Sequence, residues 1–186
     1  MDNKQNRVCP VELAGSLDSK IRKWIHNPIK IMRPYIKEGM TVLDIGCGPG
    51  FFSIEIARMV KDSGKVIAAD LQEGMLEIVN QKIKGTELDR RIVLHKCGED
   101  EIGITGNVDF IFAFYMIHEV RDQNNLFREL KSILKSGGKI YIIEPKLHVS
   151  KKSFEEMINR IKDMGFEITG RPKVFFSRTV LLTIKK

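Results

Sequence analysis

Cysteine is scarce in this sequence, and its cysteines follow no metal-binding pattern. The 186 residues contain three, Cys9, Cys47 and Cys97, which lie far apart and form no C-x-x-C motif. A small odd number of scattered cysteines is typical of reduced thiols in a cytoplasmic protein and argues against a disulfide framework or a zinc site. We therefore expect a cytoplasmic protein without a metal centre.

Long apolar runs and a secretory signal are also missing. The longest apolar run, Phe110 to Ile117, is far shorter than the roughly 20 residues that a membrane-spanning helix needs. The first residues, Met1 to Arg7, are polar and lack the apolar core of a signal peptide. The sequence thus predicts no membrane span.

The positive charge is not gathered into a block. Lys and Arg number 31 against 24 Asp and Glu, which gives a formal net charge of +7. Such an excess favours anionic partners, including RNA and anionic lipid. The basic residues are dispersed and are not interleaved with aromatic residues, which favours a solvated basic surface. Nucleic acid therefore stays an open but less favoured partner.

The length and composition fit one globular domain. Hydrophobic residues make up 42% and charged residues 30% of the 186 residues. We take residues 1–186 as a single domain, with a helical segment 1–38 ahead of a core 39–186. Ile21, Trp24 and Ile25 indicate one short helix, and Asn27-Pro28 indicates the start of another through about Ile36. The 1–38 segment is either a lid over a ligand site or an extra packing layer.

From residue 40 onward, short β-rich runs alternate with amphipathic windows. This alternation is typical of an α/β protein with a parallel sheet and crossover helices. Several runs are apolar on both faces, as expected for strands that are covered on both sides. The predicted strands are Thr41–Ile45, Val66–Asp70, Ile92–His95, Val108–Phe114, Lys139–Glu144 and Arg178–Ile184.

Apolar spacing predicts four crossover helices. Their stripes run from Phe52 to Val60, Met75 to Ile83, Leu126 to Leu134 and Phe154 to Ile161. The boundary signals are Gly85 after the second, Asp122 and Gly137-Gly138 around the third, and a Ser153/Glu156 capping box and Gly165 around the fourth. Between Lys96 and Val108 the glycines leave room for one helical turn near Asp100.

The segment Val42–Gly50, VLDIGCGPG, joins a buried strand to a helix through a glycine-rich turn. Glycines at 46, 48 and 50 lack a Cβ, so a ligand can lie directly on the backbone. In open α/β sheets, ligands bind at the carboxyl ends of the strands. A tight turn without a ligand is the alternative explanation, but the full strand–turn–helix context favours a binding site.

The motif differs from a dinucleotide or phosphate loop. A third glycine of the G-x-G-x-x-G pattern would fall at position 51, which is Phe51, and no G-x-x-x-x-G-K-[ST] loop occurs. Asp44 would repel a phosphate, but it suits a ligand that carries an ammonium or a sulfonium group. These residues argue against a nicotinamide-dependent oxidoreductase.

Acidic residues follow the next two strands. Asp70 ends the second strand, at the distance past the glycines where an acid accepts hydrogen bonds from ribose hydroxyls. A cap for the helix that contains Met75 is the alternative. After the third strand, Gly98, Glu99 and Asp100 offer one carboxylate to an adenine amine and a second one to solvent.

These motifs together resemble the class I S-adenosylmethionine-dependent methyltransferases. The resemblance covers Gly39 to Ile184 and rests on VLDIGCGPG (42–50), AAD (68–70), CGED (97–100), VDFIFAFYMIHEV (108–120), LKSILKSGGKIYIIEP (130–145) and RTVLLTIKK (178–186). It implies a Rossmann-like, seven-stranded, mostly parallel sheet with helices on both faces. The implied strand order is 3-2-1-4-5-7-6, with Val174–Phe176 as the sixth strand and Arg178–Ile184 as the antiparallel last strand.

The resemblance also implies S-adenosylmethionine as cofactor and S-adenosylhomocysteine as product. Asp44, Gly46 and Gly48 would line the methionine end, Asp70 would hold the ribose, and Glu99 or Asp100 would face the adenine. Backbone near Ala113 and Phe114 would contact the methionine amine. The expected cofactor residues are Asp44, Gly46, Cys47, Gly48, Gly50, Asp70, Leu71, Gly98, Glu99, Asp100 and Phe114.

Methyl transfer is a direct displacement that depends mainly on positioning, and it needs a base only where the acceptor loses a proton. His118, just past the fourth strand, is the candidate base, with a packing role as the alternative. Its His-Glu pair resembles small-molecule methyltransferases related to the ubiquinone/menaquinone and arsenite enzymes, although the several cysteines of the arsenite enzymes are missing. The candidate acceptor-pocket residues are Trp24, Tyr115, Glu119, Glu144, His148 and Phe176.

The favoured function is in-line methyl transfer to a small-molecule acceptor. An RNA or protein methyltransferase is an alternative, although the N/D-P-P-Y signature of amide and adenine-amine methylation is replaced by AFYM. A non-catalytic S-adenosylmethionine-binding module is the other alternative. The sequence indicates neither the identity of the acceptor nor the oligomeric state.

Overall fold

The computed structural model describes residues 25–185. The strands are β1 (Thr41–Ile45), β2 (Lys65–Asp70), β3 (Ile92–Lys96), β4 (Val108–Phe114), β5 (Leu134–Pro145), β6 (Phe166–Gly170) and β7 (Ser177–Ile184). The α-helices are α3 (Pro28–Met32), α4 (Ser53–Val60), α5 (Glu73–Ile83), α6 (Gln123–Ile133) and α7 (Lys151–Asp163), and 3₁₀ turns lie at η2 (Glu87–Arg90) and η3 (Ile117–Glu119).

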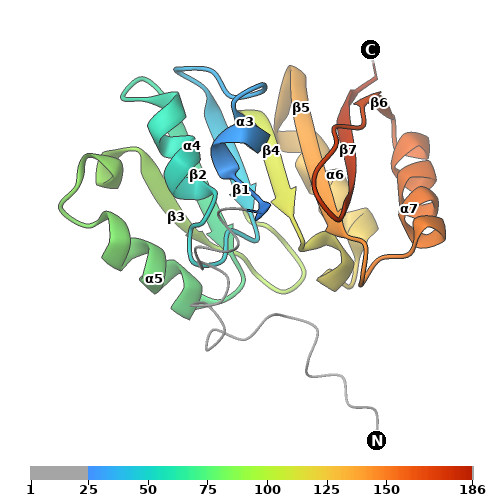
Figure 1. Ribbon diagram of the computed structural model, residues 1–186, viewed down its shortest axis with the longest axis horizontal. Helices are drawn as coiled ribbons and strands as arrows, with labels where there is room; N and C mark the ends of the chain where they lie inside the picture. The colour runs from blue at the N-terminus through green and yellow to red at the C-terminus, as the bar shows by residue number, and fades with distance from the viewer. Residues whose placement is uncertain (1–24, 186) are drawn as a thin grey trace, which may run out of the picture.

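The strands form a seven-stranded sheet in the order β3-β2-β1-β4-β5-β7-β6 (Figure 1). β1 to β5 pair in parallel, and β7 runs antiparallel to both β5 and β6. The strand order and the antiparallel seventh strand are therefore confirmed. Because β1 to β4 point the same way, their carboxyl ends gather at one edge of the sheet.

Helices cover both faces of the sheet, as predicted. Side chains of α3, α4 and α5 pack on one face, and those of α6 and α7 pack on the other. β4 shows why the strands are apolar throughout: Phe110, Phe112 and Phe114 face the first layer, while Ile111 and Ala113 face the second. Alternate residues of one strand thus enter two separate cores.

The predicted sixth strand is wrong. β6 is Phe166–Gly170, and Val174–Phe176 lies in the connection to β7. Only Phe166 of β6 is buried, so this edge strand has little apolar pattern to reveal it. Phe176, in contrast, belongs to an apolar run but has a left-handed backbone with φ of +51°, which an extended strand does not allow.

The predicted end of the third crossover helix is also wrong. α6 ends at Ile133, and Leu134 already belongs to β5, so Gly137-Gly138 lies inside a strand. A Cβ on Gly138 would lie 2.7 Å from Leu134 Cδ1 and 2.9 Å from the Lys135 carbonyl oxygen. Close packing at an irregular stretch of β5, rather than helix termination, therefore requires this glycine.

The predicted turn near Asp100 does not form within the described residues. The segment after β3 instead inserts Ile102 into the core, where it is buried. His95 Nε2 lies 2.7 Å from the Ile102 carbonyl oxygen, and the Ile102 N–H donates to Glu129 Oε2 at 2.8 Å. These side chains replace the hydrogen bonds that a helix would have supplied.

The N-terminal part confirms one helix start. Asn27 caps α3 by accepting from the Lys30 N–H at 3.1 Å, and Pro28 is the first helical residue. The helix ends at Met32 instead of Ile36, but both residues are buried in the first layer. The helix predicted around Ile21 and Trp24 falls largely outside the described residues, so the lid and the domain division stay predictions. No described helix has the length and hydropathy needed to cross a membrane.

The capping box predicted for the last crossover helix is misplaced. The cap of α7 is Ser150, whose side chain accepts from the Ser153 N–H at 3.0 Å. Ser153 lies inside the first turn, and Gly165 follows the helix as predicted. The predicted cap lies three residues after the observed one, because serines occupy both position 150 and position 153.

This correction predicts that Ser150→Ala lowers the free energy of unfolding by about 1 kcal/mol, because one N–H of the first turn loses its acceptor. Ser153→Ala, the matched control, should change it by less than about 0.5 kcal/mol. Urea unfolding of the two variants measures both values. A larger loss in Ser153→Ala would restore the original assignment of the cap.

Candidate functional site

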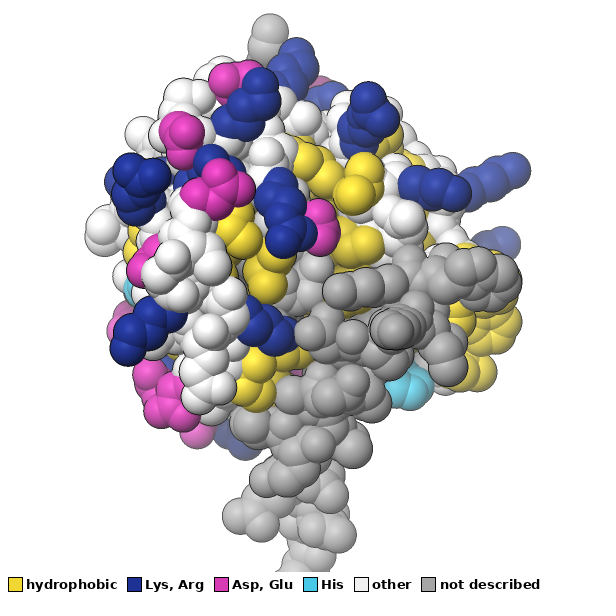
Figure 2. Space-filling model, turned by 60° about the vertical axis from the view of Figure 1, so that its left-hand side comes forward, with side chains coloured by type: hydrophobic (Ala, Val, Ile, Leu, Met, Phe, Trp, Pro, Cys, Tyr) yellow, Lys and Arg dark blue, Asp and Glu magenta, His cyan; other side chains and the backbone are white. Residues whose placement is uncertain are grey.

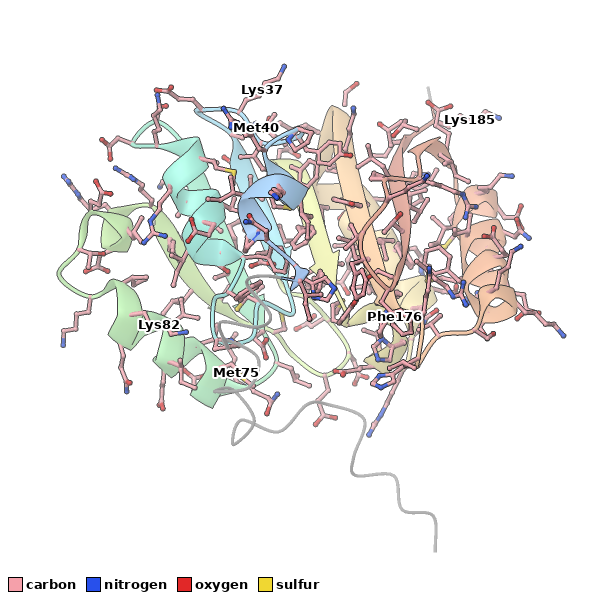
Figure 3. All side chains as sticks on the ribbon, in the orientation of Figure 1. Lys37, Met40, Met75, Lys82, Phe176 and Lys185 are labelled. Atoms are coloured by element: carbon pink, nitrogen blue, oxygen red, sulfur yellow. The ribbon has the colours of Figure 1, made fainter. Side chains whose placement is uncertain are left out.

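A cavity of about 830 Å³ opens at the edge of the sheet where the parallel strands end. Its walls come from the turn after β1, the ends of β2, β3 and β4, η3, and the segment before β7. Figure 3 shows Met75 and Phe176, which both line the cavity, at this edge, and Lys37, Met40 and Lys185 at the opposite edge. A volume of this size is typical of small-molecule sites.

The glycine turn after β1 is held by the end of β2. The N–H groups of Gly46 and Cys47 donate to the Ala69 carbonyl oxygen at 2.8 and 3.0 Å. The next N–H, that of Gly48, donates to Asp70 Oδ2 at 2.8 Å. The turn is therefore shaped by its neighbouring strand.

The three glycines of the turn serve different purposes. Gly46, Gly48 and Gly50 all have positive φ angles. A Cβ on Gly46 would lie 2.8 Å from Met116 Cβ, and one on Gly50 would lie 3.0 Å from Val79, whereas Gly48 has open space at this position. Gly48 is thus the glycine whose missing side chain leaves room for a ligand, and Gly46 and Gly50 serve packing.

Two buried carboxylates stand beside this turn. Asp44, near the end of β1, accepts a hydrogen bond of 2.5 Å from the hydroxyl of Ser53, the first residue of α4. Asp70, at the end of β2, accepts from the Gln72 N–H at 2.9 Å in addition to Gly48. Burial raises the pKa of Asp70, and the backbone N–H groups oppose this shift. Gln72, not Asp70, is the cap of α5, so the capping alternative is not what the structure shows.

Among the charged side chains on the described wall of the cavity, acidic ones far outnumber basic ones. Eight carboxylates line it, and Arg121 is the one Lys or Arg side chain among the described lining residues. The acidic residues are Asp44, Asp70, Glu99, Asp100, Glu101, Glu119, Asp122 and Glu129. This wall contrasts with the net charge of +7 of the whole chain. It favours a cationic ligand over a polyanionic one.

His118 lies in η3, where Glu144 of β5 reaches it. His118 Nδ1 and Glu144 Oε2 are 2.6 Å apart. The hydrogen bond to Glu144 raises the pKa of His118, burial opposes the shift, and the charges of Glu144 and Glu119 add to it. His148 lies next to this pair, with its ring centroid 5.6 Å from that of His118.

An aromatic and hydroxyl cluster lies at the end of β4, where His26, Phe114 and Tyr115 line the cavity. The Tyr115 hydroxyl lies 2.7 Å from Ser177 Oγ and 3.1 Å from His26 Nε2. Tyr115 also has a left-handed backbone, with φ of +58°, and its ring stacks on Phe114 at 4.0 Å between centroids. These contacts hold the end of β4 against the segment that carries Phe176.

The two described cysteines are not activated thiolates. Burial raises the pKa of Cys47 well above its usual range, and it raises the pKa of Cys97 to about 11. Both thiols are therefore protonated near neutral pH and are poor nucleophiles and metal ligands. Within residues 25–185, no group of three or more His, Cys, Asp or Glu side chains is arranged to hold a metal ion.

Most of the predicted site residues meet in this one cavity. Those that line it are Asp44, Gly46, Cys47, Gly48, Asp70, Leu71, Gly98, Glu99, Asp100, Phe114, Tyr115, His118, Glu119, His148 and Phe176. Gly50 does not line it and packs against α5. Glu144, predicted as a pocket residue, is only 1% exposed and lies behind His118 instead. Trp24 lies outside the described residues.

Sequence reasoning missed His26, Ser177, Arg121 and Glu101. His26 comes from the segment before α3, and Ser177 begins β7, which is far away in the chain. No periodicity or motif marks either residue. Arg121 and Glu101 follow recognised motifs by one residue and were within reach of the sequence patterns.

Comparisons with known proteins agree with this geometry. Residues 36–172 match the family described as "Methyltransferase domain". The chain belongs to this methyltransferase family. The match and the sheet order together confirm the resemblance to class I S-adenosylmethionine-dependent methyltransferases.

Individual relatives are more distant. A demethylmenaquinone methyltransferase of Bacillus cereus is 27% identical over 66% of this chain, which spans only 51% of that relative's length. A S-adenosylmethionine-dependent methyltransferase of Aquifex aeolicus superimposes with a TM-score of 0.84, at 29% identity, over 95% of this chain and 99% of the other. A putative rRNA methylase of Clostridium thermocellum shares the fold, with a TM-score of 0.64, 21% identity and coverage of 87% and 93%.

The charged groups of the cavity suit S-adenosylmethionine. The cofactor carries a sulfonium, an ammonium and one carboxylate group, so its net charge is positive, and the buried carboxylates of Asp44 and Asp70 lie beside the turn that contains Gly48. Phe51, which replaces the third glycine of a dinucleotide loop, is buried with its ring centroid 5.1 Å from that of Phe52. A diphosphate therefore finds no glycine at this helix start.

The different settings of the glycines predict different costs of substitution. Gly48→Ala should lower the free energy of unfolding by roughly 1–2 kcal/mol, the cost of a left-handed backbone for a residue with a Cβ. Gly46→Ala should lower the free energy of unfolding by roughly 1–3 kcal/mol more than Gly48→Ala does, because the added methyl group overlaps Met116. Denaturant unfolding measures both losses, and equal losses would contradict this assignment.

Proposed function

We propose that this methyltransferase transfers the methyl group of S-adenosylmethionine to a small-molecule acceptor by in-line displacement. The observation that carries the proposal is the carboxylate-lined cavity at the ends of β1 to β4, in a chain whose net charge is positive. Methyl transfer needs the acceptor, the methyl carbon and the sulfur in line, and positioning alone supplies roughly 7–11 kcal/mol. A cavity built on strand ends provides that rigidity.

The cofactor contacts are part of the proposal. Asp44, Gly46, Cys47 and Gly48 would line the methionine end together with Phe114. Asp70 and Leu71 would face the ribose, and Gly98 with Glu99 or Asp100 would face the adenine. In support of these roles, all of these residues lie on the wall of the cavity described above. S-adenosylmethionine supplies a methyl group on a positively charged sulfur, which leaves as a neutral thioether.

A small molecule is favoured over RNA by the distribution of charge. Acidic side chains line the cavity, so a polyanion would be repelled where the acceptor must enter. Among the described side chains on the face shown in Figure 2, basic and acidic groups lie interspersed. The name of the Bacillus cereus relative, a demethylmenaquinone methyltransferase, also supports a small acceptor. The rRNA methylase shares the fold alone.

Ligand binding tests the cofactor assignment. S-adenosylmethionine and S-adenosylhomocysteine should each stabilise the protein, by about 2.7 kcal/mol at a hundredfold excess over Kd, and NAD should not. Asp70→Asn should weaken this stabilisation, because an amide replaces the carboxylate at the end of β2. Thermal unfolding with and without each ligand measures the effect.

Asp109→Asn is the matched control for that variant. Asp109 accepts from the Thr41 N–H and from Lys135, both at 2.8 Å, near the start of β4 and away from the cavity. S-adenosylmethionine and S-adenosylhomocysteine should stabilise the Asp109→Asn variant as much as they stabilise the wild type. A wild-type melting temperature that changes with neither S-adenosylmethionine nor S-adenosylhomocysteine would contradict the proposed function.

His118 is proposed as the base for an acceptor that loses a proton. His118→Asn should lower kcat by roughly 10²–10⁴-fold, the usual contribution of a general base, while the stabilisation by S-adenosylmethionine stays unchanged. The measurement is transfer of labelled methyl groups to the small molecules of a cell extract, followed by kinetics on the identified product. Wild-type turnover in this variant would assign His118 to packing.

A further inference from the structure

Glu144 is a buried carboxylate near the carboxyl end of β5. It is the next-to-last residue of β5, between β4 and β7, and is 1% exposed. Burying a charged group is costly unless hydrogen bonds compensate for the lost water. We therefore expect hydrogen-bond donors around the Glu144 carboxylate.

Donors on η3 converge on this carboxylate. The Ile117 N–H donates to Oε1 at 3.1 Å, and the His118 N–H donates to Oε2 at 3.3 Å. The His118 ring adds the short contact of 2.6 Å between Nδ1 and Oε2. The backbone bonds place η3, and the ring bond orients one imidazole with respect to the cavity.

The chemistry of the pair determines where the ring proton lies. Both oxygens of Glu144 already accept a backbone N–H, so we assign the carboxylate as the acceptor of the ring bond and Nδ1 as its donor. In the neutral imidazole, Nε2 then holds the lone pair. Among the residues that the structure describes, no hydrogen-bond partner is found for Nε2 of His118, whose side chain is 23% exposed and lines the cavity.

Other groups around the ring add to or balance this effect. Glu144 approaches from β5, Glu119 from η3 itself, and His148 from the loop after β5. The two carboxylates favour the protonated ring, and burial opposes them. The base form of His118 is therefore available only above a raised pKa, and the ring is correspondingly a stronger base there.

We propose that Glu144 is a positioning residue that fixes His118 as the Nδ1–H tautomer and turns the lone pair of Nε2 into the cavity. The site is then built for acceptors that enter protonated, such as a hydroxyl group or an acidic C–H, rather than for a thioether or an unprotonated ring nitrogen. This inference rests on the proposed function, because it concerns the acceptor side of the same site.

The chemical step balances with these groups. The acceptor atom forms a bond to the methyl carbon, the carbon–sulfur bond breaks, and its electron pair stays on the neutral thioether. The acceptor's proton moves to Nε2 of His118, which becomes an imidazolium beside the carboxylate of Glu144. Release of that proton to water restores the neutral ring.

The first experiment needs no acceptor. Long-range ¹H–¹⁵N spectra of the imidazole rings, recorded over a pH series on the full chain, report the tautomer and the pKa of His118. We expect the Nδ1–H tautomer and a raised pKa in the wild type, and a lower pKa in Glu144→Gln. An Nε2–H tautomer in the wild type would overturn the inference even if the variant does not fold.

Kinetics separates positioning from a purely structural role. Glu144→Gln should lower kcat at least about 10-fold, by analogy with the loss of carboxylates that orient metal-bound imidazoles, with little change in KM for S-adenosylmethionine. The acidic limb of its pH–rate profile should move to lower pH, because the charge that raises the pKa of His118 is gone. Glu144→Asp should restore part of kcat and part of the shift of the acidic limb. A lower kcat with an unmoved limb would contradict positioning.

Controls distinguish this inference from the proposed function. Asp109→Asn removes a carboxylate that also accepts a backbone N–H, but at the opposite edge of the sheet, and should leave the His118 pKa and the pH limb unchanged. Labelled S-adenosylmethionine is offered with a phenol, a thioether and a pyridine as probe acceptors, and we expect Glu144→Gln to slow only methylation of the phenol. Binding of S-adenosylmethionine together with equal slowing of all three would overturn this inference and leave the proposed function standing.

Discussion

The end of β2 holds the glycine turn of β1 in place, and the site depends on this contact. Ala69 accepts the first two N–H groups of the turn, and the Asp70 side chain accepts the third, from Gly48. The turn therefore lines the cavity with its backbone held in place, and a Cβ is missing at Gly48, where the space is open. Without these hydrogen bonds, the N–H groups of the turn would need other acceptors, and those acceptors would occupy the cavity.

Three buried carboxylates lie at the ends of three different strands, and each accepts hydrogen bonds from its own donors. The Ser53 hydroxyl donates a hydrogen bond to Asp44. Backbone N–H groups donate to the other two: those of Gly48 and Gln72 to Asp70, and those of η3 to Glu144. Each lies last or next to last in its strand, so the parallel strands bring them to one edge. Acidic side chains are thus concentrated at one place in a chain that is basic as a whole, and this electrostatic contrast favours a cationic ligand.

Patterns that depend on local burial predicted the sheet well. The strand from Val108 to Phe114 was found with its bounds because both of its faces are apolar. β6 was missed because an edge strand buries only Phe166, and its polar residues resemble a loop. The helical turn near Asp100 was wrong because long-range bonds from His95 and Glu129 stabilise an irregular segment there.

Sequence alone indicated the glycine turn, the acids at the ends of β1 and β2, and the bounds of β4, because each depends on neighbours in the chain. Tertiary structure alone decided that Glu144 lies behind His118 and not in the cavity, and that Ser177 meets Tyr115. These pairs are 26 and 62 residues apart in the chain. Only the sheet order, which places β5 between β4 and β7, brings their side chains within hydrogen-bond distance.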